Sequence, residues 1–107
     1  MMEAMALGKP VIATGYSGNL DFMDDDNSLL VGWEYTPVTG CYAKMVPGAQ
    51  WAEPNVAEAT AYLKMLYRHP RLRELYGSRG REKIIKEWTY QRLGQEIMDN
   101  LQCFMDQ

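Results

Sequence analysis

The stretch that decides the fold is residues 3–22, Glu-Ala-Met-Ala-Leu-Gly-Lys-Pro-Val-Ile-Ala-Thr-Gly-Tyr-Ser-Gly-Asn-Leu-Asp-Phe. Its first five residues favour a helix, and Gly8 is typical of the position just after a helix end. Pro10 cannot continue that helix but is compatible with the start of a strand. Residues 11–13 are a short apolar run, typical of a parallel strand covered on both faces.

A loop and a short helix are predicted after this strand. Residues 14–19 would lie at the carboxyl end of the strand, where open α/β sheets bind their ligands. Residues 18–23 read as a short helix whose first residues, Gly18 and Asn19, suit an N-cap and a bound anion. Its Leu20, with Phe22 or Met23, would face the core. The stretch therefore predicts an α/β fold with a ligand site beside residues 14–19.

The same residues resemble a known family. Glu-Ala-Met-Ala-x-Gly-Lys-Pro-Val-Ile-Ala-Thr, followed by a glycine-bearing loop and Asp21, resembles the C-terminal half of GT-B retaining glycosyltransferases of the family-4 type. Residues 51–54, Trp-Ala-Glu-Pro, followed by a helix, resemble the tail of that domain. The resemblance implies a partial Rossmann-like domain with a short parallel sheet followed by three C-terminal helices. Residues 1–107 would be the C-terminal portion of a nucleotide-sugar-binding domain.

This resemblance implies transfer of a sugar, with retention, from a nucleotide-sugar donor to a glycan or other acceptor. In the family a glutamate ends an E-x7-E motif and contacts the ribose hydroxyls of the donor, and Glu3 matches that glutamate. Ala4 would pack beneath the nucleotide, and Gly15 and Tyr16 would neighbour the donor. The residues alone leave a second role for Glu3 open, because a glutamate in a first helical turn stabilises the helix dipole by ~0.3–1 kcal/mol. No residue is assigned a catalytic role.

The resemblance covers most of the chain but only part of the family's domain. The first glutamate of the motif, the phosphate-binding Arg and Lys, and the glycine loop that meets the sugar would precede residue 1. Because retaining transfer relies largely on stabilising the leaving diphosphate, we expect the chain of 107 residues to be inactive alone. A second hypothesis stays open, in which the chain is a non-catalytic helical interaction module or a decayed remnant of such an enzyme.

Composition narrows the classes of partner. The net charge is −3 and the pI is about 5.1, so no basic stripe is present to neutralise nucleic-acid phosphates. No apolar run approaches the ~18 residues of a transmembrane helix, and no signal peptide is visible. The two cysteines, Cys41 and Cys103, form neither a disulfide framework nor a metal-ligand spacing. We expect a cytoplasmic location, or one peripheral to a membrane in the case of the full-length enzyme.

Two polar features suggest other sites but have simpler explanations. Residues 24–27, Asp-Asp-Asp-Asn, could bind a divalent ion through oxygen ligands, but a charge run of this kind is typical of a solvated turn. GT-B enzymes also lack the Asp-x-Asp metal site of the other large glycosyltransferase fold, so no metal or cofactor is expected. His69 lies at a predicted helix end without a partner at metal-ligand spacing, and we assign it no catalytic role.

The rest of the chain is predicted to contain one more strand and three helices. Residues 28–33 read as a second buried strand, and residues 34–53 as a long irregular connection. The aromatic residues of that connection would either plug the core or form a wall for sugar stacking. Two strands alone leave unpaired edges, so we expect self-association or a partner that carries the N-terminal half.

The three helices are predicted over 54–69, 71–88 and 90–105, with Thr89 as the N-cap of the last one. Gly77 and Gly80 fall inside the second helix, which indicates a bend or close packing there. Apolar side chains at helical spacing would face inward from the first and last helices. These are Val56, Ala59, Leu63, Leu66 and Tyr67, followed by Leu93, Ile97, Leu101 and Phe104.

Overall fold

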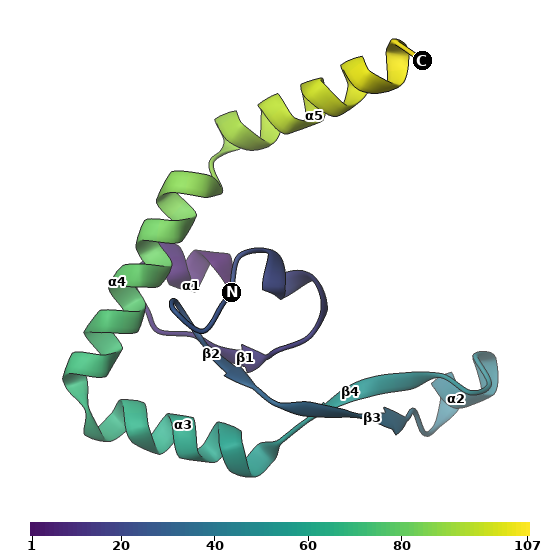
Figure 1. Ribbon diagram of the computed structural model, residues 1–107. Coiled ribbons are helices and arrows are strands. Elements are labelled where there is room, and N and C mark those ends of the chain that lie inside the picture. Colours follow the sequence, from purple (N-terminus) through teal and green to yellow (C-terminus); the bar gives the residue numbers. More distant parts are fainter.

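The computed structural model describes residues 1–107, and it is a flat molecule with extents of 51 × 45 × 18 Å. A small centre is formed by α1, β1, β2 and α4, while the β3–β4 hairpin and α5 project from it in different directions (Figure 1). In chain order the elements are α1 (Met2–Ala6), β1 (Ile12–Thr14), the 3-10 helix η1 (Ser17–Asp21), β2 (Leu29–Val31), β3 (Trp33–Pro37), α2 (Cys41–Met45), β4 (Gln50–Pro54), α3 (Val56–Arg68), α4 (Pro70–Glu87) and α5 (Tyr90–Met105).

Helix α1 ends as its glycine predicts. Gly8 adopts a φ of +70°, in the left-handed region that favours glycine. The N–H of Lys9 donates to the carbonyl of Ala4 at 2.9 Å, and the N–H of Gly8 donates to the carbonyl of Met5 at 2.9 Å. This pair of bonds is a Schellman motif, which satisfies carbonyls that the helix leaves free. The predicted order of helix, glycine stop and strand is confirmed.

The central sheet is a parallel pair, and the α/β class is confirmed at this level. Strand β1 pairs with β2 in the register Ile12↔Leu29 and Thr14↔Val31. Leu29 and Val31 are buried, but every residue of β1 is only partly buried. The expectation that β1 is covered on both faces is therefore wrong, because the flat molecule leaves one of its sides open.

The chain after β2 differs most from the sequence prediction. The strand predicted over 28–33 ends at Val31, and after Gly32 the chain enters β3, which pairs antiparallel with β4 in a separate sheet. The predicted irregular connection is thus a hairpin with α2 at its tip. Pro37, Gly40, Pro47 and Gly48 indicated a loop, but Pro37 ends β3, where proline is tolerated, and the other three lie between the strands. Pro54, predicted to begin the first long helix, ends β4 instead, and α3 starts at Val56. The exposed aromatic residues of this segment do not plug the core.

Helix α4 crosses the centre and completes the core. Met5, Met23 and Ile84 form the buried apolar cluster, which joins α1, the segment after η1, and α4. Gly77 and Gly80 are buried within α4, which runs through them as one helix. They serve the close packing that the sequence indicated. Arg81 also donates a hydrogen bond from α4 to the carbonyl of Ala6 at the end of α1.

The segment between β1 and β2 is a compact polar turn. The helix predicted over 18–23 is the shorter 3-10 helix η1, in which no residue is buried and Leu20 is exposed. Met23, two residues after its end, is buried. Asp24 Oδ1 accepts hydrogen bonds from the N–H groups of Asp26 at 2.9 Å and Asn27 at 3.1 Å. Such bonds from an aspartate to the following backbone are typical of an Asx turn, as the polar-turn interpretation predicted.

Helix α3 packs on the centre through one side only. Asn55 Oδ1 caps it by accepting from the N–H of Glu58 at 3.0 Å. The two oxygens of Glu58 accept from the N–H of Gly32 at 2.6 Å and from the hydroxyl of Tyr62 at 3.0 Å. Leu66 is buried, whereas three members of the predicted inward stripe are exposed, namely Val56, Leu63 and Tyr67.

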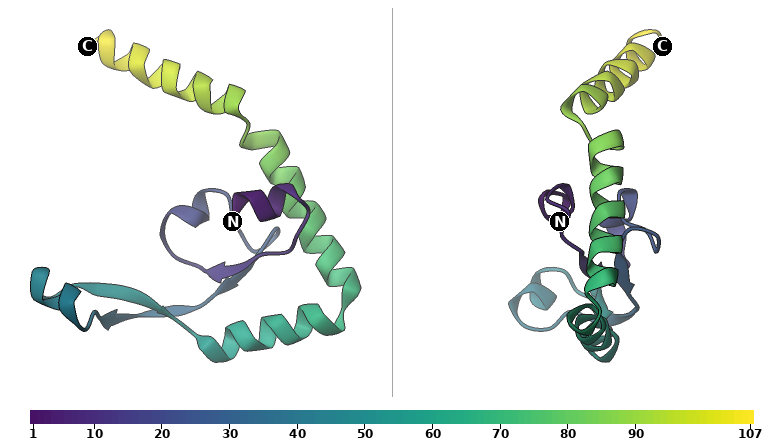
Figure 2. Two further views of the ribbon diagram at one scale, coloured as in Figure 1. Left: turned by 180° about the vertical axis from the view of Figure 1, so that it is seen from behind. Right: turned by 90° about the vertical axis from the view of Figure 1, so that its left-hand side faces the viewer.

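Helix α5 packs weakly on the rest of the molecule, because only its first turns lie beside α1 and the end of α4 and the remainder projects away (Figure 1). Thr89 caps it, as predicted, by accepting a hydrogen bond from the N–H of Arg92 at 3.2 Å. No residue of α5 is buried, and both views in Figure 2 leave most of it clear of the other elements. The prediction that its apolar face points inward is wrong for Leu93, Ile97, Leu101 and Phe104. No helix in the molecule combines the length and apolarity needed to cross a bilayer.

Candidate functional site

The loop after β1 lines an open cleft that runs along β1 and is closed on its other side by β4. This cleft, called the β1 cleft below, has a volume of about 620 Å³. Its lining includes apolar and neutral polar residues and no charged side chain. The lining residues are Met1, Ile12, Ala13, Thr14, Tyr16, Asn19, Gln50, Trp51 and Ala52.

Backbone and side-chain hydrogen bonds hold the loop in place. The N–H of Gly15 donates to the carbonyl of Val31 at 2.9 Å, which extends the pairing of β1 with β2. The carbonyl of Gly15 accepts from the indole Nε1 of Trp33 at 2.7 Å. Asn19 Nδ2 donates to the carbonyl of Thr14 at 3.0 Å, and this hydrogen bond joins the two ends of the loop. Ser17 takes a left-handed φ of 70°, uncommon for a residue with a side chain.

Three rings gather beside this loop, and we call them the aromatic cluster (Tyr16, Trp33 and Tyr35). The centroids of Tyr16 and Trp33 lie 4.7 Å apart, and those of Trp33 and Tyr35 lie 4.9 Å apart, both edge-to-face. Tyr16 is 38% exposed and Tyr35 is 58% exposed. Hydrogen bonding to the Tyr16 hydroxyl, more than charge or burial, raises the pKa of the Tyr35 phenol. The cluster thus presents ring surface to solvent.

Glu3 and Ala4 lie on α1. The Glu3 side chain is 92% exposed, and its carboxylate lies 3.5 Å from the chain's terminal amine. A hydrogen bond from its own backbone N–H, and then this amine, lower the pKa of Glu3. The carboxylate is therefore ionised at neutral pH and can accept hydrogen bonds from a ligand. Ala4 is partly buried, and its carbonyl is used by the Schellman motif.

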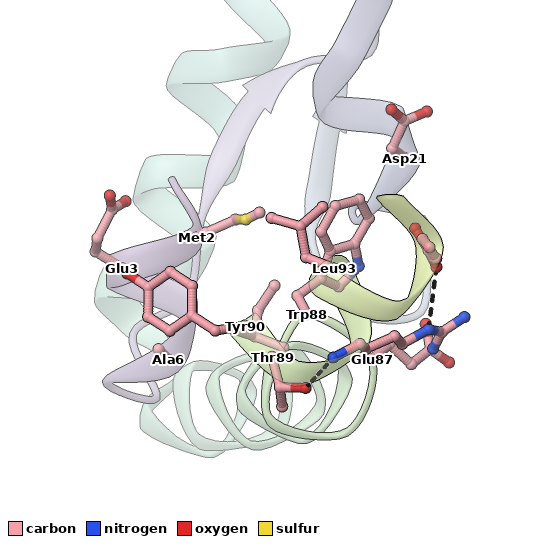
Figure 3. Close-up of a pocket in the computed structure, with 12 residues that line it drawn as sticks. Met2, Glu3, Ala6, Asp21, Glu87, Trp88, Thr89, Tyr90 and Leu93 are labelled. Atoms are coloured by element: carbon pink, nitrogen blue, oxygen red, sulfur yellow. Dashed lines mark hydrogen bonds and ion pairs between the residues drawn. The ribbon is translucent and has the colours of Figure 1, made fainter. Parts of the chain in front are cut away.

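Glu3 belongs to a second hollow, called the α1–α5 groove below, with a volume of about 420 Å³. Figure 3 shows Met2 pointing toward Leu93 and Trp88, while the Glu3 carboxylate points away from them. The groove is apolar inside and charged at its rim. Its lining residues are Met2, Glu3, Ala6, Asp21, Ile84, Glu87, Trp88, Thr89, Tyr90, Arg92, Leu93 and Glu96.

The structure brings some predicted site residues together and separates others. Gly15 and Tyr16 lie at the same loop, and Tyr16 lines the β1 cleft. Glu3 lines the α1–α5 groove instead, although its neighbour Met1 lines the β1 cleft. The first turn of α1 therefore stands between the two hollows.

Sequence reasoning did not single out two contributors to the β1 cleft region. Trp33 orients the loop through its indole, and Gln50 offers an amide from β4. The spacing of Trp33 and Tyr35 could have indicated that both rings lie on one face of a strand, because residues two apart in a strand share a face.

No group of three or more His, Cys, Asp or Glu side chains is placed to hold a metal ion. Cys41 and Cys103 are both free and exposed. The chemistry that the two hollows offer is hydrogen bonding, aromatic stacking and, in the α1–α5 groove, the charged side chains at its rim, Glu3 among them.

Comparisons with protein-family models, with curated proteins and with solved structures found no match to this chain.

Proposed function

We propose that this chain is the C-terminal part of the nucleotide-sugar-binding domain of a GT-B retaining glycosyltransferase. The observation that carries the proposal is the exposed, ionised carboxylate of Glu3 on a helix that leads directly into β1. The parallel pairing of β1 with β2 supports it, because such sheets bind ligands at the carboxyl ends of their strands. The proposed location is cytoplasmic, where nucleotide-sugars would be available.

In this proposal Glu3 accepts hydrogen bonds from the two ribose hydroxyls of the donor. Ala4 packs beneath the nucleotide, and Gly15 and Tyr16 neighbour the donor at the end of β1. Neither Arg nor Lys lines the β1 cleft, so these residues cannot neutralise a leaving diphosphate. The chain supplies a binding surface, and the cationic groups that catalysis needs come from another part of the enzyme. No turnover is expected from residues 1–107 alone.

Binding of the donor tests the proposal directly. Ligand-observed NMR with UDP-glucose, GDP-mannose and ADP-glucose should detect contact between the ribose protons of at least one donor and the chain. Glu3→Gln should weaken that contact about tenfold, because a neutral amide replaces a charged acceptor. Glu34→Gln on β3 is the matched control, and its binding should equal that of the unmodified chain. Absence of binding for all three donors, or equal binding by Glu3→Gln, would overturn the proposal.

The alternative function is a helical interaction module, and the apolar face of α5 favours it. Seven apolar residues on this helix are between 48% and 92% exposed, which is unusual for a helix that functions alone in water. They are Tyr90, Leu93, Ile97, Met98, Leu101, Phe104 and Met105. The same surface, with the open edges of β1 and β2, would serve a second copy or a complementing N-terminal half.

Sedimentation velocity over a range of concentrations distinguishes a second copy of the chain from a complementing N-terminal half as the partner of α5. Self-association that Leu93→Gln and Ile97→Gln abolish would support an interaction surface on α5. A monomer at every concentration would count against self-association and leave the complementing half as the partner of the proposed enzyme. Nucleotide-sugar binding that requires Glu3 favours the enzyme in either case.

A further inference from the structure

We propose that the outer face of α3 in one copy of this chain docks into the α1–α5 groove of a second copy. This contact goes beyond the proposed function and does not rest on it, because it involves no donor. Three features support it, namely an exposed helix face that is apolar and basic, an apolar groove with an acidic rim, and the presence of both surfaces on every copy.

The first feature is the outer face of α3. Val56, Leu63 and Tyr67 follow one another at helical spacing and are 67%, 62% and 84% exposed. Lys64 and Arg68 lie one turn apart beside this apolar stripe, and both are exposed. A helix face with apolar anchors at this spacing is typical of a helix that docks into a groove of a partner.

The positive charge of this face is not balanced within the molecule. Neither Lys64 nor Arg68 forms an ion pair. The one acidic residue of α3, Glu58, instead accepts hydrogen bonds from the N–H of Gly32 and the hydroxyl of Tyr62. The outer face therefore carries positive charge that an acidic partner can neutralise.

The second feature is the α1–α5 groove, which can receive such a helix face. Its interior is apolar, with Met2 pointing toward Trp88 and Leu93 (Figure 3). The volume of about 420 Å³ can hold the side chains of one stripe but not the body of a helix, which is about 10 Å across. The apolar side chains of α3 would enter the groove while the helix itself lies over the opening.

Carboxylates predominate at the rim of this groove. Arg92 is the one cationic side chain among the lining residues, whereas the acidic ones are Glu3, Asp21, Glu87 and Glu96. Asp21 forms no ion pair, and the side chains of Glu87 and Glu96 stay 41% and 58% exposed in theirs. Exposed pairs contribute little to stability, so these carboxylates can accept a second cation. The charge of the rim is thus opposite to that of the α3 face.

The third feature is that one copy carries both surfaces without overlap. No residue of α3 lines the groove, so a copy can provide its helix face and receive that of its partner at the same time. A two-fold axis would form the contact twice, with the two copies exchanging equivalent surfaces. The expected assembly is a closed dimer.

Sedimentation equilibrium at several salt concentrations tests the contact. The unmodified chain should form a dimer of twice the 12.3 kDa of one copy, and the dimer should weaken as salt screens the charges. Lys64→Glu with Arg68→Glu should raise the dissociation constant by roughly a hundredfold, because like charges then face each other. Lys9→Glu with Lys44→Glu is the matched control, since it changes the net charge equally at exposed positions outside both surfaces.

An exchange of charges identifies the two surfaces as partners. Asp21→Lys with Glu96→Lys reverses charge at the groove rim and should also abolish the dimer. Mixing this variant with the Lys64→Glu/Arg68→Glu variant should restore a dimer, because every contact then joins opposite charges. Circular dichroism of each variant alone should match that of the unmodified chain.

Four results would overturn the proposal. A monomer at every concentration would exclude a second copy, and flotation of that monomer on phosphatidylserine vesicles through Lys64 and Arg68 would assign the α3 face to a membrane. A dimer that survives both pairs of reversals would assign self-association to another surface, such as the open edges of β1 and β2. Failure of the mixed variants to associate would show that α3 and the groove do not face each other.

Donor binding separates this contact from the proposed function. Lys64→Glu with Arg68→Glu should leave contact with the donor's ribose unchanged, because neither residue lines the β1 cleft or the α1–α5 groove. Absence of donor binding in a chain that dimerises through α3 would overturn the proposed function alone.

Discussion

Gly77 on α4 lies directly against the carbonyl group of Gly8, at the end of α1. A Cβ placed on Gly77 would overlap the carbonyl oxygen and come within 2.9 Å of the carbonyl carbon. At this point two elements from distant parts of the chain meet backbone to backbone. A side chain on Gly77 would therefore push α1 and α4 apart, whereas one on Gly8 is disfavoured by the left-handed φ of +70° and would meet nothing closer than 3.8 Å.

Replacing Gly77 with alanine should destabilise the molecule even though alanine is the better helix former. Overpacking of this kind typically costs about 1–3 kcal/mol, and the gain of ~1 kcal/mol in helix propensity offsets only part of a backbone clash. We expect a lower midpoint of urea denaturation for Gly77→Ala, followed by circular dichroism. The matched control is Gly94→Ala on α5, where the new Cβ meets nothing within 4 Å. That variant should gain helicity, and an equal response of the two variants would contradict the close contact.

The two helix caps should behave differently although they are chemically alike. Asn55 caps α3, which packs on the centre, and Thr89 caps α5, which buries none of its residues. Asn55→Ala should lower the free energy of unfolding by about 1 kcal/mol, the usual value of such a cap. Thr89→Ala should fray α5 while leaving the unfolding midpoint of the centre unchanged. Hydrogen exchange resolved by residue would measure both effects.

A drop in the protection of amides in β1 or α4 in Thr89→Ala would show that α5 is coupled to the centre. That result would contradict the autonomy of the helix.

The indole of Trp33 should contribute to stability through its hydrogen bond to Gly15. Trp33→Phe keeps an aromatic ring but leaves the partly buried carbonyl without this partner, at a cost of about 1–2 kcal/mol. Trp51→Phe is the control, because Trp51 is exposed and its indole makes no hydrogen bond. Urea denaturation of the two variants gives the comparison, and equal midpoints would remove the role assigned to Trp33.

The bond between Tyr62 and Glu58 should make stability depend on alkaline pH. The hydrogen bond to Glu58, with smaller effects of burial and charge, raises the pKa of Tyr62 above its ordinary value of 10.0. A raised pKa means that the protonated phenol is favoured by folding. The stabilisation is therefore complete below pH 10.0 and is lost as the pH rises through the folded value.

Tyr62→Phe should remove this alkaline loss, measured as the free energy of unfolding at a series of pH values. Tyr67→Phe is the matched control on the same helix, since the exposed Tyr67 hydroxyl makes no hydrogen bond. The control should keep the alkaline loss of the unmodified chain. Identical pH profiles for Tyr62→Phe and the unmodified chain would exclude the bond as its cause.

The sequence predicted the elements that local residues determine. Gly8 ends α1 and Thr89 starts α5, because a left-handed residue and a capping hydroxyl act within one helical turn. The parallel pairing of β1 and β2 also followed from the sequence. The hairpin did not, because Pro37 and Pro47, with Gly40 and Gly48, indicate a loop unless the place of Pro37 at a strand end is known. Pairing between strands is a property of two segments, and neither one reveals it alone.

Burial was harder to predict than secondary structure. The spacing of Leu93, Ile97 and Leu101 correctly defines an apolar face, but periodicity does not say whether anything covers that face. In the candidate site, too, some positions could be predicted from the local sequence and others could not. Gly15 and Tyr16 were placed by the strand before them, whereas the separation of Glu3 from the β1 cleft depends on how α1 lies in space.

The isolated position of α5 also sets how the chain responds to heat. A helix of 16 residues that buries none of them is only marginally stable in water, and such a helix forms and melts on a submicrosecond timescale. The centre is held by long-range packing and can melt cooperatively. Ellipticity should therefore fall along a sloping baseline as α5 unwinds, before the cooperative transition begins. A two-state fit to the whole signal would combine two separate equilibria in one apparent midpoint.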